Sequence, residues 1–257
     1  MRLADRRVLV VGASSGIGRA TGRAIAAEGG RVAFAARRLD RLKQAVADAG
    51  EQCFALFCDV CEEADCTSVV AEAVATLGGL DALVYSPGIG VFKPVEEIGA
   101  DEWRHAFETN VLGATLVMRA ALPHLREVRG KAVFFSSISI DDAPPRSNYA
   151  PYVVTKVALE TLIQAWQGEH PSVGFTTIAI GDTTTEFGFD HDPDVLGSIV
   201  QRWVQDGYMY GRTMEAASVA EQVVNVLASP ETVRRLAITP RYGDESDAVV
   251  QGVWDRD

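Results

Sequence analysis

The sequence predicts an α/β fold of one domain, a doubly wound parallel sheet of seven strands flanked by helices. Short apolar runs rich in β-branched residues alternate along the chain with longer segments of helical spacing. Continuous apolar runs are typical of strands buried on both faces, and helical crossovers make consecutive parallel strands neighbours. The expected strands are residues 8–11, 32–36, 54–57, 82–85, 132–135, 175–180 and 236–239. The expected helices are residues 17–28, 39–49, 64–77, 103–125, 152–167 and 218–227.

Composition narrows the class of protein before any motif is considered. The 257 residues are 47% hydrophobic and 23% charged, with a net charge of −11 at pH 7, which fits one globular domain. This acidity argues against a nucleic acid or an anionic membrane surface as partner. No apolar stretch approaches the roughly 18 residues of a membrane helix. Four cysteines are too few for a disulfide scaffold, so we expect a reduced, cytoplasmic protein.

A glycine-rich turn follows the first strand. Residues 12–18 read GASSGIG and lead directly into the first helix. Glycine permits a tight turn and a close approach of the backbone to a pyrophosphate, while the free N–H groups of the helix start face the anion. A mere tight loop is the other interpretation, but the position between strand and helix favours a dinucleotide site. The expected cofactor contacts here are Gly12, Ser14, Ser15, Gly16 and Ile17.

The ends of the second and third strands indicate which dinucleotide is bound. A carboxylate that holds the adenosine ribose of NAD is usual after the second strand, but Arg37 and Arg38 stand there. A guanidinium binds a 2′-phosphate well, which favours NADP, with NAD possible. Alternatively, the two arginines only begin an exposed helix. Asp59 and Val60 end the third strand, where they could contact the adenine edge.

A tyrosine and a lysine four residues apart follow the fifth strand. Tyr152 and Lys156 lie on one face of a predicted helix, at the carboxyl edge of the sheet where ligands of this architecture bind. A phenol is a poor acid or base at neutral pH, but a neighbouring ammonium stabilises the phenolate. Tyr152 could then give a proton to a carbonyl oxygen as a hydride reaches the carbon, or take it back.

Together these residues resemble the short-chain dehydrogenase/reductase family, in order and over nearly the whole chain. The motifs are the glycine turn, Asn110, the Ser-Ser stretch after the fifth strand and the Tyr152/Lys156 pair. The resemblance implies a Rossmann fold and a catalytic tetrad. In that tetrad Tyr152 is the acid–base, and Lys156 binds the nicotinamide ribose and lowers the tyrosine pKa. It also implies that a serine orients the substrate and that Asn110 holds a water of the proton relay.

Two serines compete for the place in the tetrad. The usual family spacing from serine to tyrosine selects Ser139, whereas the Ser-Ser doublet that closes the strand selects Ser137. We favour Ser137, because residues 141–146 read as a loop that could absorb a short insertion.

Two neighbouring strand ends depart from the family pattern. Val11 precedes the glycine turn where the family usually has Thr, and Ser86 and Pro87 replace an Asn and an Ala before Gly88. Both departures lie beside the expected cofactor, and Gly88 is kept as a contact. We hypothesise that the two replacements are coupled and that Pro87 keeps the glycine turn rigid.

Residues 181–212 are the least regular part of the sequence, and we expect a substrate-binding lid there. The resemblance implies cofactor contacts for Gly181, Thr183 and Thr185; solvated loop hydroxyls are the alternative. Aromatic residues of this segment could line a pocket for a fairly hydrophobic small molecule, or could simply pack the lid. They are Phe187, Phe189, Trp203, Tyr208 and Tyr210.

The cysteines and histidines do not predict a metal site. The spacing of the cysteines matches the start of an iron–sulfur pattern, but most of them fall on a buried strand or at a helix start, where packed thiols are the usual case. The histidines are dispersed and have no ligand spacing on a helix. These residues are Cys53, Cys58, Cys61, Cys66, His105, His124, His170 and His191.

The leading functional hypothesis is an NADP(H)-dependent oxidoreductase that acts on a secondary alcohol or ketone. The alternative is a noncatalytic dinucleotide-binding sensor or scaffold, which would not need the Tyr152/Lys156 pair. Redox-inert lyase or dehalogenase chemistry on this fold usually dispenses with the cofactor turn, which is present here. The resemblance also implies a homo-oligomer, a tetramer or a dimer.

Overall fold

Seven parallel strands form the central sheet in the computed structural model, which describes residues 1–188, 191–209 and 212–241. The strand order is β3-β2-β1-β4-β5-β6-β9. The strands are β1 (Arg7–Val11), β2 (Arg31–Ala36), β3 (Cys53–Phe57), β4 (Ala82–Tyr85), β5 (Lys131–Ser137), β6 (Gly174–Ile180) and β9 (Arg235–Ile238). Every expected strand is present with small differences at its ends, so the doubly wound parallel sheet is confirmed.

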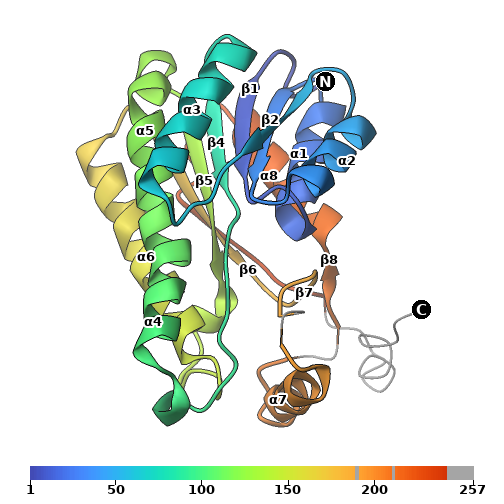
Figure 1. The fold of residues 1–257 in the computed structure, drawn as a ribbon, viewed down its shortest axis with the longest axis vertical. Helices are drawn as coiled ribbons and strands as arrows, with labels where there is room; N and C mark the ends of the chain where they lie inside the picture. The colour runs from blue at the N-terminus through green and yellow to red at the C-terminus, as the bar shows by residue number, and fades with distance from the viewer. Residues whose placement is uncertain (189–190, 210–211, 242–257) are drawn as a thin grey trace.

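Helices cover both faces of the sheet (Figure 1). On one face lie α1 (Gly16–Ala27), α2 (Leu39–Ala49) and α8 (Ala216–Ala228). On the other lie α3 (Glu63–Leu77), α5 (Gly113–Val128) and α6 (Ala150–Glu169). Within the described residues, no helix combines the length and the apolar character needed to cross a membrane.

The strand β1 shows why continuous apolar runs predict this sheet. Its residues Val8 to Val11 are completely buried. Leu9 and Val11 join the core beneath α3 and α5, while Val8 and Val10 join the core beneath α1 and α8. Because successive side chains point to opposite faces, a strand between two helical layers must be apolar at every position.

The order of the strands reverses between β1 and β4, which fixes the place of the site. Val11, the last residue of β1, lies opposite Ala35 of β2 and Tyr85 of β4. The chain leaves β1 and β4 at the same carboxyl edge, and a crevice forms there because the two crossovers turn to opposite sides. The glycine turn and residues 86–88 therefore meet at this edge.

The helix expected over residues 103–125 is interrupted, so that prediction is wrong in its middle part. The segment consists of α4 (Ala100–Phe107), a π-helical turn η2 (Glu108–Leu112) and α5. The Tyr85 hydroxyl donates a 2.6 Å hydrogen bond to the carbonyl oxygen of Thr109. A side chain that donates a hydrogen bond to a helix carbonyl oxygen disturbs the regular pattern of backbone hydrogen bonds in the helix. Turns of π-helix are often found at functional sites.

The expectation of an irregular segment over residues 181–212 is also wrong in part. Residues Pro193–Gln205 form the helix α7 (Figure 1), which Asp192 caps by accepting hydrogen bonds from the backbone N–H groups of Asp194 and Val195. The smaller elements are the strands β7 (Thr183–Thr184) and β8 (Met214–Glu215) and the 3₁₀ turns η1 (Val95–Glu97) and η3 (Ile138–Ile140).

Candidate active site

A cavity of about 910 Å³ lies at the carboxyl edge of the sheet, within the size range of small-molecule sites. The ends of the strands β1 to β6 and the segment after β6 line it. The cavity brings together the sequence-predicted residues Gly12, Ser14, Ser15, Gly16, Ile17, Arg37, Arg38, Asp59, Val60, Gly88, Ser137, Tyr152, Lys156, Gly181, Thr183 and Thr185. Asn110 is completely buried and does not line the cavity.

The glycine turn is packed too tightly for any larger residue at two positions. Gly12 has φ +79°, and a Cβ there would lie 2.7 Å from the backbone nitrogen of Pro87. A Cβ at Gly18 would lie 2.3 Å from the carbonyl oxygen of Gly12. Pro87 thus lies against the turn, as our hypothesis of a coupled replacement requires. Among the described residues no side chain caps α1, so the N–H groups of its first turn are left for an anion.

Arginines stand at the outer end of this turn. Arg38 donates hydrogen bonds to the hydroxyl of Ser15 at 2.8 Å and to that of Ser14 at 3.1 Å. Arg37 is largely exposed and lies 3.8 Å from a carboxylate oxygen of Asp59. Glu186, from the segment after β6, pairs with Arg38 at 3.4 Å and also with Arg41. The cavity therefore has a cationic end at which a carboxylate already lies.

Tyr152 lies at the opposite end of the cavity, near the start of α6. The hydroxyls of Ser137, at the end of β5, and of Tyr149 are the polar groups that act on its hydroxyl. The ring stacks on that of Tyr149 with centroids 4.5 Å apart. Burial raises the pKa of Tyr152 to about 12, against the lowering effect of these two hydroxyls. The phenol is consequently neutral in the cofactor-free protein and can act as a proton donor.

Ser137 and Ser139 occupy different positions relative to this phenol. Ser137 lines the cavity. Ser139 is 1% exposed, its hydroxyl lies 2.8 Å from that of Ser137, and its backbone N–H donates to the same oxygen at 3.1 Å. Ser139 therefore supports Ser137 from the protein side, while Ser137 faces Tyr152.

Lys156 lies one helical turn after Tyr152 and is almost completely buried. Its ammonium donates a 2.7 Å hydrogen bond to the carbonyl oxygen of Phe135 and lies 5.4 Å from the centre of the Tyr152 ring. Burial lowers the pKa of Lys156 from 10.5 to about 8. The amine thus titrates near neutral pH, where a bound anion would shift it back towards the charged form.

The buried Lys156 predicts that the stability of the cofactor-free protein depends on pH. Between pH 8 and 10.5 the folded lysine has lost its proton and the unfolded one has not. The contribution of this residue to the free energy of unfolding therefore rises with pH through that window. The full rise is about 3 kcal/mol, at about 1.4 kcal/mol for each pKa unit.

Urea unfolding of the wild type and of Lys156→Met at a series of pH values isolates this contribution, because the other titrating groups are common to both proteins. We expect the wild type to gain stability relative to the variant from pH 8 towards 10.5. A constant difference across that range would show that Lys156 keeps an ordinary pKa.

Asn110 lies in the π-helical turn and is held by the protein itself. Its amide nitrogen donates to the carbonyl oxygen of Ile89 and to the hydroxyl of Thr155, and its oxygen accepts from the N–H of Ile89, each at 2.9 Å. Both amide hydrogens are thereby used, and one lone pair of the oxygen is left for a further partner. Asn110 therefore connects the segment that follows β4 to α6, the helix that carries Tyr152.

A buried arginine on the substrate side of the cavity is a feature that the sequence analysis missed. The Arg146 side chain is 3% exposed and pairs with Asp142 at 2.8 Å and with Asp182 at 2.9 Å. It also donates to the carbonyl oxygen of Tyr208 and lies over the ring of Trp203. Burial would lower the pKa of Arg146, but the two carboxylates raise it. This network joins the loop before α6 to the end of β6 and to the segment after α7.

An aromatic cluster forms the wall next to Tyr152. Of the expected aromatic residues, Phe187 and Trp203 line the cavity and Tyr208 packs against the cluster; Phe189 and Tyr210 lie outside the described residues. The sequence analysis did not single out Phe92 and Tyr149, which stack with centroids 5.2 Å apart. For Tyr149, a second tyrosine three residues before Tyr152 was the available signal; it directly precedes α6, and its ring stacks on that of Tyr152.

The two threonines after β6 make local hydrogen bonds. The Thr183 hydroxyl donates to the carbonyl oxygen of Gly181 at 2.8 Å, and the Thr185 hydroxyl accepts from the N–H of Phe187 at 3.1 Å. Thr185 lies over the glycine turn, because a Cβ at Gly16 would come within 3.4 Å of it. Both hydroxyls line the cavity beside the turn.

A family model described as short chain dehydrogenase matches residues 6–194 of the chain. Two curated relatives are similar over most of its length. Glucose 1-dehydrogenase of Gluconobacter oxydans is 31% identical over 214 residues, which cover 81% of this chain and 76% of the relative. An uncharacterized oxidoreductase of Methylorubrum extorquens is 30% identical over 236 residues, which cover 90% of this chain and 93% of the relative.

Solved structures also resemble this one. An alcohol dehydrogenase from the archaeon Thermococcus sibiricus, complexed with 5-hydroxy-NADP, has a TM-score of 0.78 and 28% identity, covering 92% of this chain and 96% of that one. A 3-ketoacyl-(acyl-carrier-protein) reductase from Brucella melitensis, complexed with NADH, has a TM-score of 0.80 and 23% identity over 92% and 98% of the two chains. The second likeness shows the fold alone.

Proposed function

The chain belongs to the short-chain dehydrogenase family and is an oxidoreductase, and we propose that it transfers a hydride between NADP(H) and the carbon of a secondary alcohol or ketone. One observation carries this proposal. The Tyr152 phenol, with Ser137 beside it and the Lys156 ammonium 5.4 Å from its ring centre, lines the same cavity as the glycine turn.

The residues of the cavity fit a dinucleotide. Gly12 and Gly18 leave no space for a side chain in the turn, so the backbone can approach a pyrophosphate closely, and the uncapped start of α1 offers N–H groups to it. Asp59, Val60, Thr183 and Thr185 also line the cavity, and we propose that Asp59 and Val60 contact the adenine. When bound, the dinucleotide would supply the hydride to a ketone or accept it from an alcohol.

Three side chains would handle the proton and the substrate oxygen. The Tyr152 hydroxyl donates its proton to the carbonyl oxygen in reduction and takes it back in oxidation. The Ser137 hydroxyl holds the same oxygen by a hydrogen bond. The Lys156 ammonium binds the nicotinamide ribose and stabilises the phenolate that Tyr152 becomes. Asn110 positions α6 and offers its free lone pair to a water of the proton relay.

A binding and turnover experiment distinguishes this function from that of a noncatalytic sensor. NADPH fluorescence titration measures binding, and a panel of ketones with NADPH measures turnover. We expect both saturable binding and oxidation of NADPH by at least one class of ketone. Binding without turnover on any ketone or alcohol would favour the sensor.

The arginines at the cationic end support NADP as the preferred cofactor. Arg38 already donates to two hydroxyls of the glycine turn, so its guanidinium lies where a phosphate beside the turn would be. We expect Arg38→Ala to weaken NADPH binding about 10- to 100-fold, because a hydrogen bond to a charged group contributes about 1.5–3 kcal/mol. NADH binding should change little. Fluorescence titration of both cofactors measures the two affinities.

Two further variants control this prediction. Arg37→Ala removes a neighbouring charge that is mostly exposed and should have a smaller effect. Glu186→Gln removes the carboxylate that occupies Arg38 and Arg41 and should strengthen NADPH binding. Equal losses of NADPH and NADH affinity in Arg38→Ala would contradict a role in recognising the 2′-phosphate.

We further infer that residues 181–212 form the substrate lid and that the substrate is fairly hydrophobic. Phe187 and Trp203 support this inference, since both line the cavity and pack with Tyr149 and Tyr152. The buried Arg146 network anchors the lid to the loop before α6.

We also infer a homo-oligomer, a tetramer or a dimer, in the cytoplasm. Exposed apolar side chains at Leu112, Val154 and Val157 on neighbouring helical elements support an interface there. The four cysteines, all within the described residues, are free thiols, as in a reducing compartment.

A further inference from the structure

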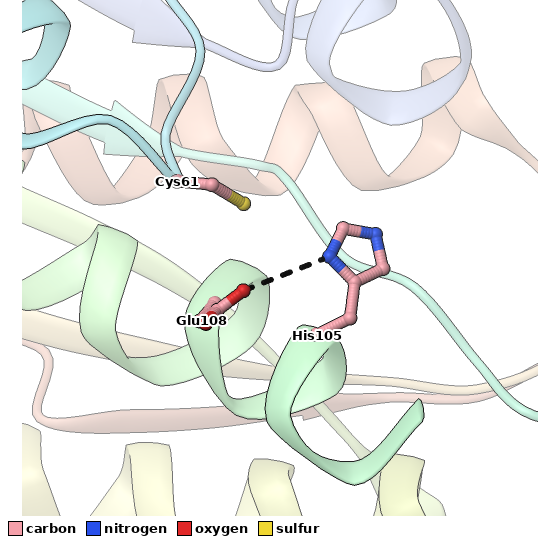
Figure 2. A group of neighbouring side chains, drawn as sticks. All are labelled: Cys61, His105 and Glu108. Atoms are coloured by element: carbon pink, nitrogen blue, oxygen red, sulfur yellow. Dashed lines mark ion pairs between the residues drawn. The ribbon is translucent and has the colours of Figure 1, made fainter. Parts of the chain in front are cut away.

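A cysteine, a histidine and a glutamate from two separate parts of the chain lie close together (Figure 2), and the cysteine, Cys61, also lines the cavity. Cys61 lies on the loop between β3 and α3, while His105 is in α4 and Glu108 begins the π-helical turn. The Cys61 sulfur, a ring nitrogen of His105 and a carboxylate oxygen of Glu108 all lie within 4.8 Å of one another. We propose that these three side chains bind a zinc ion, with water as the fourth ligand.

The donor set selects zinc among the common cations. Thiolate and imidazole are ligands that zinc prefers, whereas magnesium and calcium take oxygen ligands almost exclusively. Ligand atoms bound tetrahedrally at about 2.0–2.3 Å from zinc lie roughly 3.5 Å apart. His105 and Glu108 are about half exposed, at 52% and 47%, so their side chains can close the remaining gap without moving the backbone.

The contacts that these side chains now make are weak and easily replaced. The Cys61 sulfur lies 3.5 Å from the Thr109 hydroxyl, and the ring of His105 lies 4.0 Å from Glu108, an exposed pair that contributes little to stability. Binding would release the thiol proton of Cys61. The thiolate and the carboxylate then balance the two charges of the ion, with Asp59 and Arg37 as the nearest further charges acting on Cys61.

The linear sequence conceals this site, which is why we expected no metal from it. His105 stands 44 residues after Cys61, and the crossover through α3 and β4 brings them together. The site is distinct from the proposed chemistry at Tyr152, and it needs neither cofactor nor substrate. Its test is therefore independent of the proposed function.

Metal titration of the reduced, cofactor-free protein tests the proposal. Zinc binding is measured by competition with a chromophoric indicator, and cobalt serves as a spectroscopic probe, because a bound thiolate gives a charge-transfer band. We expect one equivalent of zinc and a cobalt band that is lost in Cys61→Ser. His105→Ala and Glu108→Gln should each weaken zinc binding at least about tenfold, since even partners outside the ligand set cost 10–100-fold.

Matched variants at other positions are the controls. Cys53→Ala and His124→Ala remove a thiol and an imidazole elsewhere in the chain and should bind zinc as the wild type does. The two surface variants, His105→Ala and Glu108→Gln, guard against a folding defect in Cys61→Ser. The proposal is overturned if the wild type binds no stoichiometric zinc, or if the control variants lose as much affinity as the ligand variants.

Discussion

Tyr152→Phe is expected to lower kcat for ketone reduction by about 10²–10⁴-fold, the usual contribution of a positioned general acid. The substitution removes one oxygen and leaves the ring, which remains stacked on Tyr149 and in edge contact with Phe187. Cofactor affinity should therefore stay close to that of the wild type. Steady-state turnover and NADPH titration on the same preparation measure the two quantities.

Tyr149→Phe is the matched control, because it removes the same phenol oxygen from the ring that stacks on that of Tyr152. The Tyr149 hydroxyl only lowers the pKa of Tyr152, so its loss should reduce turnover far less than Tyr152→Phe does. If the two variants lost equal activity, the proton would pass through the pair as a unit. If Tyr152→Phe kept wild-type turnover, Tyr152 would not be the acid–base.

The sheet could be predicted because its strands are buried on both faces. Val8 to Val11 are fully buried, and no polar residue interrupts them. Most of the errors lie at strand starts, where Arg7, Arg31 and Lys131 are paired in the ladder but extend polar side chains towards other groups. Arg7, for example, binds Asp81 through its backbone and its side chain. A polar residue directly before an apolar run can therefore already belong to the strand.

The interrupted helix could not be predicted from spacing. Residues 103–125 keep a helical pattern throughout. The π-helical turn depends on Tyr85 of β4, whose hydroxyl donates a hydrogen bond to the carbonyl oxygen of Thr109. Residue 113 is a glycine because a Cβ at this position would lie 2.6 Å from the Tyr85 hydroxyl. Both contacts join residues that are far apart in the sequence, so local spacing could not predict them.

The residues that we propose for catalysis and cofactor binding could be located from the sequence because each group has a fixed local spacing. Tyr152 and Lys156 are four residues apart, and residues 12–18 form one turn. Arg146 was not predictable in the same way. Its main partner Asp182 lies 36 residues further on, and a loop arginine that follows two aspartates and two prolines is usually solvated. Burial of such a group is tolerated only because two carboxylates and a carbonyl oxygen pair with it.

Ser137→Ala should lower kcat by about 10²–10³-fold, the usual cost of losing a donor that stabilises the reacting oxygen. Ser139→Ala should lower kcat by no more than about tenfold, which is the contribution of one hydrogen bond. Of the two serines, only Ser137 lines the cavity, and it lowers the pKa of Tyr152. Ser139 is 1% exposed and acts through Ser137. Single-turnover reduction separates the chemical step from product release.

The double variant Ser137→Ala/Ser139→Ala decides how the two hydroxyls are related. If Ser139 only orients Ser137, through the 2.8 Å contact between their hydroxyl oxygens, its removal has no further effect once Ser137 is gone, and the double variant equals Ser137→Ala. If the two losses multiply, each hydroxyl touches the substrate independently. If Ser139→Ala alone has the larger effect, the family spacing identifies the serine correctly and the geometry of the cofactor-free site does not.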